Sequence, residues 1–140
     1  LEGGITVEEV SEIAIRLERL GIDAIEISGG MAESKVGTIR TGIDSREKEA
    51  YFLPCAKRLR KVISVPLLLV GGIRSREVAE EILNRGWADF ISLCRPLIRE
   101  PNLPNEWRNG RAEKAACLSC GKCSQYPERF IHCEAIPPGQ

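Results

Sequence analysis

The chain opens with a hydrophobic pattern of helical period and then changes to a strand-like run. Thr6 and Glu9 have the spacing of a capping box. Gly21 is placed to end the helix. Residues 23–28 (DAIEIS) then predict a short strand, which Gly29-Gly30 ends with a tight turn. The hydrophobic positions of the predicted helix share one face: Val7, Val10, Ile13, Ala14, Leu17 and Leu20.

The next stretch begins with a polar segment, residues 31–42, that predicts a loop. Asp44 and Glu47 then favour a helix start, and Pro54 is expected to kink or restart this second helix. Residues 67–70 form a continuous hydrophobic run, which is typical of a strand buried on both faces of a parallel sheet.

A third unit follows the same plan. Ser75 is expected to cap a helix that Gly86 ends, and residues 89–93 predict a third strand. The buried face of this helix is predicted to carry Val78, Ala79, Ile82 and Leu83. The alternation of helices and strands predicts an α/β fold with a parallel sheet.

Residues 20–23 and 85–89 repeat one pattern, in which a helix ends at glycine and an aspartate opens an apolar strand. Three such strands are fewer than a stable open sheet usually has. The length of 140 residues is also too short for a closed eight-stranded barrel, which takes roughly 250 residues. We therefore expect a partial barrel that needs a missing remainder or a partner chain. The first residue, Leu1, is consistent with an excised or processed segment.

The composition narrows the class of protein. Twenty basic and twenty acidic residues cancel, which gives no reason to expect a nucleic-acid partner or an anionic membrane. No apolar run approaches the roughly 20 residues that span a bilayer, and no signal peptide opens the chain. We expect a cytoplasmic protein, in which clustered cysteines more often bind metal than form disulfides.

The residues that directly follow the second and third predicted strands are candidates for a binding site. Gly71-Gly72 follows the second strand, and Cys94-Arg95 follows the third. In a β/α barrel the last two such loops often bind a phosphate through backbone N–H groups, and Arg95 can add a charge-assisted contact. An ordinary turn and a surface charge explain the same residues, so both interpretations stay open on this evidence.

Three segments resemble the C-terminal half of the Old Yellow Enzyme family of NADH:flavin oxidoreductases. They are GGITVEEVSEIAIRLERLGIDAIEIS, PLLLVGGI and AEEILNRGWADFISLCRPLIREPNLPNEW. The chain is most similar to the branch that contains bacterial 2,4-dienoyl-CoA reductase. The resemblance implies that residues 1–110 are the C-terminal β/α units of an FMN-binding (β/α)8 TIM barrel, followed by a Cys-rich metal-binding segment at 111–140.

The resemblance also implies a cofactor site. Gly71 and Gly72 would hold the FMN phosphate through their backbone, and the Cys94 N–H and the Arg95 side chain would complete it. The family often has Gly or Ala at the position of Cys94. Ser28 and Gly29, at the end of the first strand, are expected to face the flavin region.

The implied chemistry is hydride transfer from NADH or NADPH to FMN and then to a small-molecule substrate with an activated C=C bond or a similar acceptor. The family's flavin-ring contacts and its active-site His or Tyr come from earlier strands. We therefore assign no catalytic residue here and expect this chain to be inactive without the missing N-terminal half-barrel, or to self-associate.

Four cysteines cluster near the C-terminus with the spacing Cys117-x2-Cys120-x2-Cys123-x9-Cys133. This spacing is compatible with a [4Fe–4S] cluster, and the resemblance implies one that passes electrons to FMN, although the family spacing is slightly longer. A structural zinc site with four cysteine ligands and free thiols remain alternatives. Cys55 and Cys94 are expected to be small buried hydrophobic residues.

Two other functions remain open. One is a half-barrel interaction module in which the four cysteines form a structural zinc site. The other is a phosphate-binding barrel of another kind, such as a lyase or an isomerase. The glycine pair and Arg95 alone permit the latter, whereas the cysteine group argues against it.

Overall fold

The structure is a computed structural model that describes residues 4–31, 39–124 and 131–136. Within these ranges one three-stranded sheet has the order β1 (Ile25–Ile27), β2 (Leu67–Leu69) and β3 (Phe90–Ile91). Both strand pairs are parallel, with Ile25 opposite Leu67 and Leu68 opposite Phe90. The predicted parallel α/β fold is confirmed, although each strand is shorter than the hydrophobic run that predicted it.

Helices connect the strands as expected, with one difference in the second unit. The first helix, α1 (Val7–Arg19), begins with the predicted capping box: the Thr6 hydroxyl accepts from the Glu9 N–H at 3.2 Å, and the Glu9 carboxylate accepts from the Thr6 N–H at 2.7 Å. The predicted helix start at Asp44 is only the short 3-10 turn η1 (Arg46–Lys48). The helix itself is α2 (Leu53–Leu59), which Pro54 opens in its first turn.

The third helix corrects a detail of the prediction. α3 (Arg76–Asn84) does have Ser75 as its N-cap residue, but the Ser75 side chain makes no capping hydrogen bond. Its hydroxyl donates instead to the Glu49 carboxylate at 2.6 Å, and Glu49 also accepts from the Ser75 backbone N–H at 2.9 Å. Glu49 thus holds the N-cap residue of α3 from another segment, while the Arg76 N–H at the start of the helix donates to the Glu113 carbonyl at 2.9 Å.

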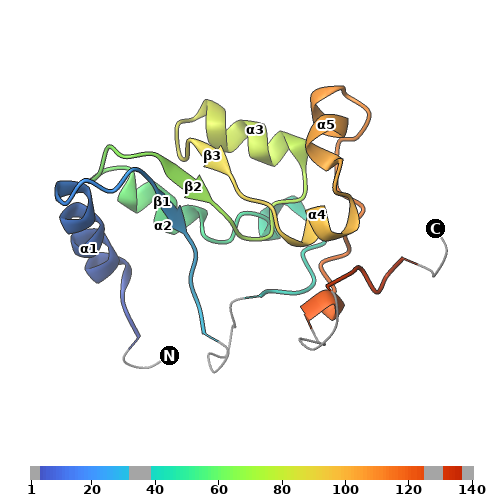
Figure 1. Ribbon diagram of the computed structural model, residues 1–140, viewed down its shortest axis with the longest axis horizontal. Coiled ribbons are helices and arrows are strands. Elements are labelled where there is room, and N and C mark those ends of the chain that lie inside the picture. The colour runs from blue at the N-terminus through green and yellow to red at the C-terminus, as the bar shows by residue number, and fades with distance from the viewer. Residues whose placement is uncertain (1–3, 32–38, 125–130, 137–140) are drawn as a thin grey trace.

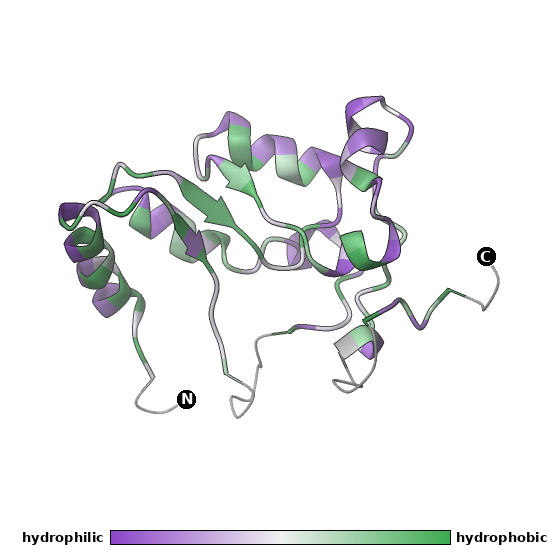
Figure 2. Cartoon of the chain, viewed as in Figure 1, coloured by the Kyte–Doolittle hydropathy of each residue, from purple (hydrophilic) through white to green (hydrophobic). Residues whose placement is uncertain are grey.

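The core lies around the middle strand. β2 is hydrophobic along its length, whereas α1 and α3 alternate hydrophobic and hydrophilic residues (Figure 2). Leu67 and Leu69 are fully buried between α2 and α3, and they pack with Leu59 and Ile82 from these helices. Leu68, which points to the opposite face of the sheet, is only partly buried, so the predicted burial of β2 on both faces is complete on one face only.

The apolar face of α1 is more exposed to solvent than the sequence pattern predicts. Only Ala14 of this helix is buried, while Ile13, Leu17 and the following Leu20 are exposed. β1 forms its hydrogen-bonded ladder with β2 alone among the described strands. The apolar face of α1 and the adjoining edge of the sheet therefore lie open at one end of the molecule (Figure 1).

The other end of the molecule carries the loops that matter for function. β3 leads directly into α4 (Arg95–Arg99), followed by α5 (Leu103–Arg108) and, in the cysteine segment, the 3-10 turn η2 (Lys122–Ser124). These elements lie on the side opposite α1 (Figure 1). Residues 113–115 pair with residues 74–76, for example through the Ala115 N–H, which donates to the Arg74 carbonyl at 2.7 Å. No helix in the described ranges is long and apolar enough to cross a membrane.

Candidate functional site

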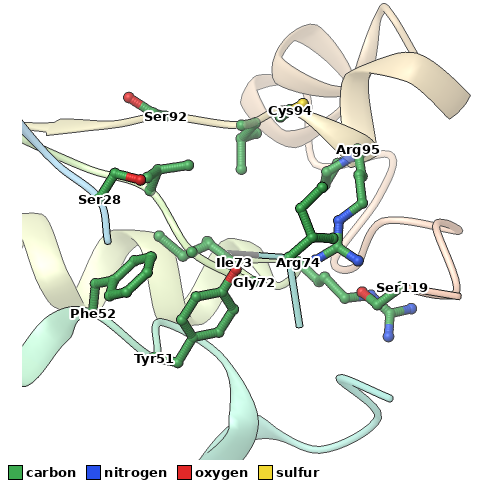
Figure 3. Close-up of a pocket in the computed structure, with 15 residues that line it drawn as sticks. Ser28, Tyr51, Phe52, Gly72, Ile73, Arg74, Ser92, Cys94, Arg95 and Ser119 are labelled. Atoms are coloured by element: carbon green, nitrogen blue, oxygen red, sulfur yellow. The ribbon is translucent and has the colours of Figure 1, made fainter. Parts of the chain in front are cut away.

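A cavity of about 200 Å³ opens at the carboxyl ends of β2 and β3. The loops after these strands line it together with the segments around Tyr51 and Ser119 (Figure 3). Its lining includes Ser28, Tyr51, Phe52, Gly71, Gly72, Arg74, Cys94, Arg95 and Ser119. In parallel α/β folds, the crevice at the carboxyl ends of the strands is where ligands usually bind.

Both the backbone conformation and the neighbouring aromatic rings require glycine at Gly71 and Gly72. Gly71 and Gly72 have φ angles of 123° and 74°, which side chains rarely adopt. A Cβ atom on Gly71 would stand 2.8 Å from the Phe52 ring, and one on Gly72 would stand 2.7 Å from the Tyr51 ring. Since the Tyr51 N–H also donates to the Gly71 carbonyl at 3.1 Å, the two aromatic residues pack directly on the bare backbone of this loop.

Two arginines bring positive charge to the cavity. Arg74 is 8% exposed; its guanidinium donates to the carbonyls of Ile43 and Ala115, the latter at 3.3 Å. Within the described part of the chain, its Nε–H and the Arg95 Nη1–H are buried and have no hydrogen-bond acceptor. The guanidinium groups of Arg74 and Arg95 bring positive charge to the cavity lining, so the cavity is suited to a ligand with anionic oxygens.

Glu49 holds the glycine loop in place. Its carboxylate is 6% exposed and accepts hydrogen bonds from the Arg74 N–H at 2.7 Å and from the Ser75 N–H and hydroxyl. These contacts join the segment before α2 to the loop after β2. Glu49 is therefore a structural anchor of the cavity, and it does not itself line the cavity.

The structure brings together most of the residues that the sequence singled out for the flavin site. Ser28, Gly71, Gly72, Cys94 and Arg95 all line the cavity. Gly29 is not among the described lining residues; a Cβ atom there would lie 3.3 Å from the Phe52 ring, so this glycine contributes close packing. The expected burial of the two single cysteines was wrong, because Cys94 is exposed at the cavity and Cys55 is only half-buried.

The four clustered cysteines converge on a second, smaller cavity. Cys117, Cys120, Cys123 and Cys133 all line it, and none forms a disulfide. In the described part of the chain, no three ligating side chains are arranged to hold a single metal ion. The thiols thus surround a shared space without meeting at one point.

Two arginines lie near the cysteines of this second cavity. Burial raises the pKa of the Cys123 thiol, and the positive charge of Arg95 opposes that rise. The Arg99 guanidinium donates to the Cys133 sulfur at 3.5 Å. Arg95 lines both cavities, so the two candidate sites are adjacent and share one cationic side chain.

Sequence reasoning missed several residues of the site. Arg74 directly follows the glycine loop, which was a usable signal, because side chains at strand ends in such folds face the ligand crevice. Tyr51, Phe52 and Glu49 gave no such signal, because their position depends on how the segment before α2 folds back. Ser119 gave no signal either, because it lies between Cys117 and Cys120, whose spacing indicates metal binding and not a contact with the glycine loop.

Comparisons with known proteins identify the family and several relatives of this chain. The family model described as "NADH:flavin oxidoreductase / NADH oxidase family" matches residues 3–114. A NADH oxidase of Thermoanaerobacter brockii is 36% identical over 86% of this chain, and a metal reductase of Desulforamulus reducens is 28% identical over 87%. The chain spans only 18% of the length of each of these relatives.

A solved structure extends the comparison to the fold. An old yellow enzyme homologue from Zymomonas mobilis matches 76% of this chain and 26% of its own, with a TM-score of 0.52 and 27% identity. The three β/α units thus form the C-terminal part of a TIM barrel, as expected. Because the family model covers most of the chain, the protein belongs to the NADH:flavin oxidoreductase / NADH oxidase family.

Proposed function

We propose that this chain supplies the FMN-phosphate site of an FMN-dependent NAD(P)H oxidoreductase that reduces activated C=C bonds or similar acceptors. The observation that carries the proposal is the cavity at the carboxyl ends of β2 and β3. It combines the glycine loop Gly71-Gly72 with buried, unpaired N–H groups of Arg74 and Arg95. A phosphate offers several anionic oxygens to such donors.

The residues of the cavity are suited to this cofactor. Gly71 and Gly72 line the cavity, and the Tyr51 and Phe52 rings fill the space that their side chains would take, so a phosphate would meet the backbone of this loop from the cavity side. Arg95 and the backbone of Cys94 come from the neighbouring loop and face the same space. FMN, when bound, supplies hydride transfer; the residues of this chain anchor its phosphate and form part of the wall beside it, and Ser28 lies at the opposite end of the cavity (Figure 3).

We assign no catalytic residue to this chain. The single histidine, His132, belongs to the cysteine segment and forms an ion pair with Glu134 at 2.9 Å when protonated. Flavin-ring contacts and an active-site acid would therefore come from the rest of the barrel. The exposed apolar residues Ile13 and Leu17 and the open edge of β1 support this view, because the preceding β/α units of a closed barrel would cover them.

The proposal includes a [4Fe–4S] cluster on Cys117, Cys120, Cys123 and Cys133. Each thiolate of such a cluster binds a different iron atom, so the ligands surround a shared space instead of meeting at one ion. The four cysteines that line one cavity support this assignment. The hydrogen bond from Arg99 to Cys133 is of the kind that tunes cluster potential. This segment is the feature that favours the 2,4-dienoyl-CoA reductase branch.

The test is a visible spectrum with elemental and flavin analysis of the full protein, purified without oxygen. About four iron and four sulfide per chain with one FMN would support the whole proposal. Stoichiometric zinc without iron would keep the flavin site and make the cysteine segment structural. Protein that neither retains nor binds FMN would contradict the proposed function.

A matched pair of variants separates a specific site from general damage. Cys120→Ser removes one proposed ligand, whereas Cys55→Ser changes a half-buried cysteine that lies in α2 and outside the cysteine cavity. We expect loss of bound metal in the first variant only. Equal metal content in both variants would contradict the assignment of Cys120 as a ligand.

A further inference from the structure

Ser119 links the two candidate sites. It lies in the sequence between Cys117 and Cys120, yet it lines the cavity of the glycine loop and is 2% exposed. In Figure 3, Ser119 lies toward the same end of the cavity as the guanidinium groups of Arg74 and Arg95. The cysteine segment therefore contributes a polar residue to the place where the positive charge gathers.

The backbone of this segment is fixed on both sides of the serine. The Arg74 carbonyl accepts from the Ala115 N–H at 2.7 Å, and the Arg74 guanidinium donates to the Ala115 carbonyl at 3.3 Å. The Ser119 carbonyl accepts from the Gly42 N–H at 3.2 Å. Segments from three parts of the chain thus hold Ser119 against the cavity.

Ser119 also has an unusual backbone conformation. Its φ angle is 51°, in the left-handed region that residues with side chains seldom adopt. Strained residues of this kind are concentrated at binding sites, where the surrounding structure enforces them. A glycine would adopt this conformation without strain, so the presence of serine indicates that its hydroxyl has a use.

We propose that Ser119 donates a hydrogen bond to the phosphate of the flavin nucleotide, so that the cysteine segment forms one wall of the phosphate site. The proposal rests on the proposed function, since it requires the cavity to hold FMN. Independent support comes from Arg74 and Arg95, which line the same cavity and bring two positive charges to it. One phosphate can accept from all three side chains.

The test compares FMN with riboflavin, which is the same flavin without the phosphate. Dissociation constants are measured by quenching of flavin fluorescence in the full protein and in Ser119→Ala and Ser119→Gly. Both variants should bind FMN about tenfold more weakly, as for one lost hydrogen bond to a charged group, and should bind riboflavin as the wild type does. Ser11→Ala, on α1 and outside the cavity lining, should change neither constant.

Each other outcome overturns the proposal in a recognisable way. Unchanged FMN binding in both variants would show that the hydroxyl makes no phosphate contact. Weaker binding of both flavins, or weaker FMN binding in Ser119→Ala alone, would show that Ser119 acts through the backbone. If the wild-type protein bound FMN no better than riboflavin, the phosphate site itself would be wrong, a failure distinct from that of Ser119 alone.

Discussion

The Glu49 carboxylate accepts two hydrogen bonds from Ser75, at 2.9 Å from its backbone N–H and at 2.6 Å from its hydroxyl. It accepts a third from the Arg74 N–H. One buried side chain thus positions both the start of α3 and the glycine loop that lines the cavity at the carboxyl ends of β2 and β3. This relationship explains how a residue outside the cavity controls its shape.

Replacing Glu49 should destabilise the protein. Glu49→Ala leaves the buried N–H groups of Arg74 and Ser75 without their acceptor, which should cost about 2 kcal/mol in the free energy of unfolding. Urea denaturation followed by tryptophan fluorescence measures the change. The exposed Glu47 is the matched control, and its alanine variant should change the free energy by less than about 0.5 kcal/mol. Equal effects in the two variants would contradict the anchoring role of Glu49.

Alanine substitutions at Gly72 and Gly86 distinguish the effect of a close side-chain contact from the effect of backbone strain. Both have positive φ angles, 74° and 65°, so alanine is strained at either position. A Cβ atom at Gly72 would meet the Tyr51 ring at 2.7 Å, whereas one at Gly86 would meet nothing within 4 Å. Gly86→Ala should therefore cost about 1 kcal/mol of stability and leave FMN binding unchanged.

Gly72→Ala should cost more than Gly86→Ala and should also weaken FMN binding, because the displaced Tyr51 ring lines the same cavity. Thermal denaturation and flavin-fluorescence titration of both variants measure the two effects. If Gly72→Ala bound FMN as tightly as Gly86→Ala, the close packing of Tyr51 on the loop would have no role in the site.

Metal loading and flavin binding should be coupled. Arg95 lines both cavities, and Ser119 lies between two of the proposed ligands. Removing the metal with a chelator should weaken FMN binding about fivefold or more, and by linkage FMN should strengthen metal binding by the same factor. Titrations of the loaded and stripped full protein give both numbers. An FMN dissociation constant that is unchanged on stripping would show that the sites are independent.

Asp89 should make stability depend on acid pH. Its carboxylate accepts from the Leu67 N–H at 2.7 Å and pairs with Arg60. The first of these contacts, assisted by the second, lowers the pKa of Asp89. A lowered folded-state pKa means that the contribution is complete above the unfolded pKa of about 3.9 and is lost as pH falls through the folded value.

Asp89→Asn should therefore lower stability at neutral pH and reduce its decline toward acid pH. Urea denaturation between pH 7 and pH 3 measures both features. A variant whose stability fell with acid as steeply as that of the wild type would show that other carboxylates cause the decline.

The sequence predicts the β/α order well because local signals and tertiary packing agree in these units. Thr6 and Glu9 do form a capping box, and Gly21 and Gly86 do adopt the left-handed conformation that ends a helix. The run at residues 67–70 does form the central buried strand. Each of these features depends on residues close together in the sequence.

The features that could not be predicted depend on contacts between distant segments. Glu49 accepts a hydrogen bond from the Ser75 N–H at the start of α3, although the two residues are 26 positions apart. Ser119 reaches the glycine loop because residues 113–115 pair with residues 74–76. Nothing in the local pattern around either residue encodes these contacts.

The most direct test of the central claim is the affinity of Arg95→Gln for FMN and for riboflavin in the full protein. If the cavity holds the flavin phosphate, this variant should bind FMN about 10- to 100-fold more weakly, as for a lost charge-assisted contact, and should bind riboflavin normally. Arg108→Gln, an exposed arginine on α5, should match the wild type. FMN binding by Arg95→Gln that equals the wild type would contradict the assignment of this cavity as the phosphate site.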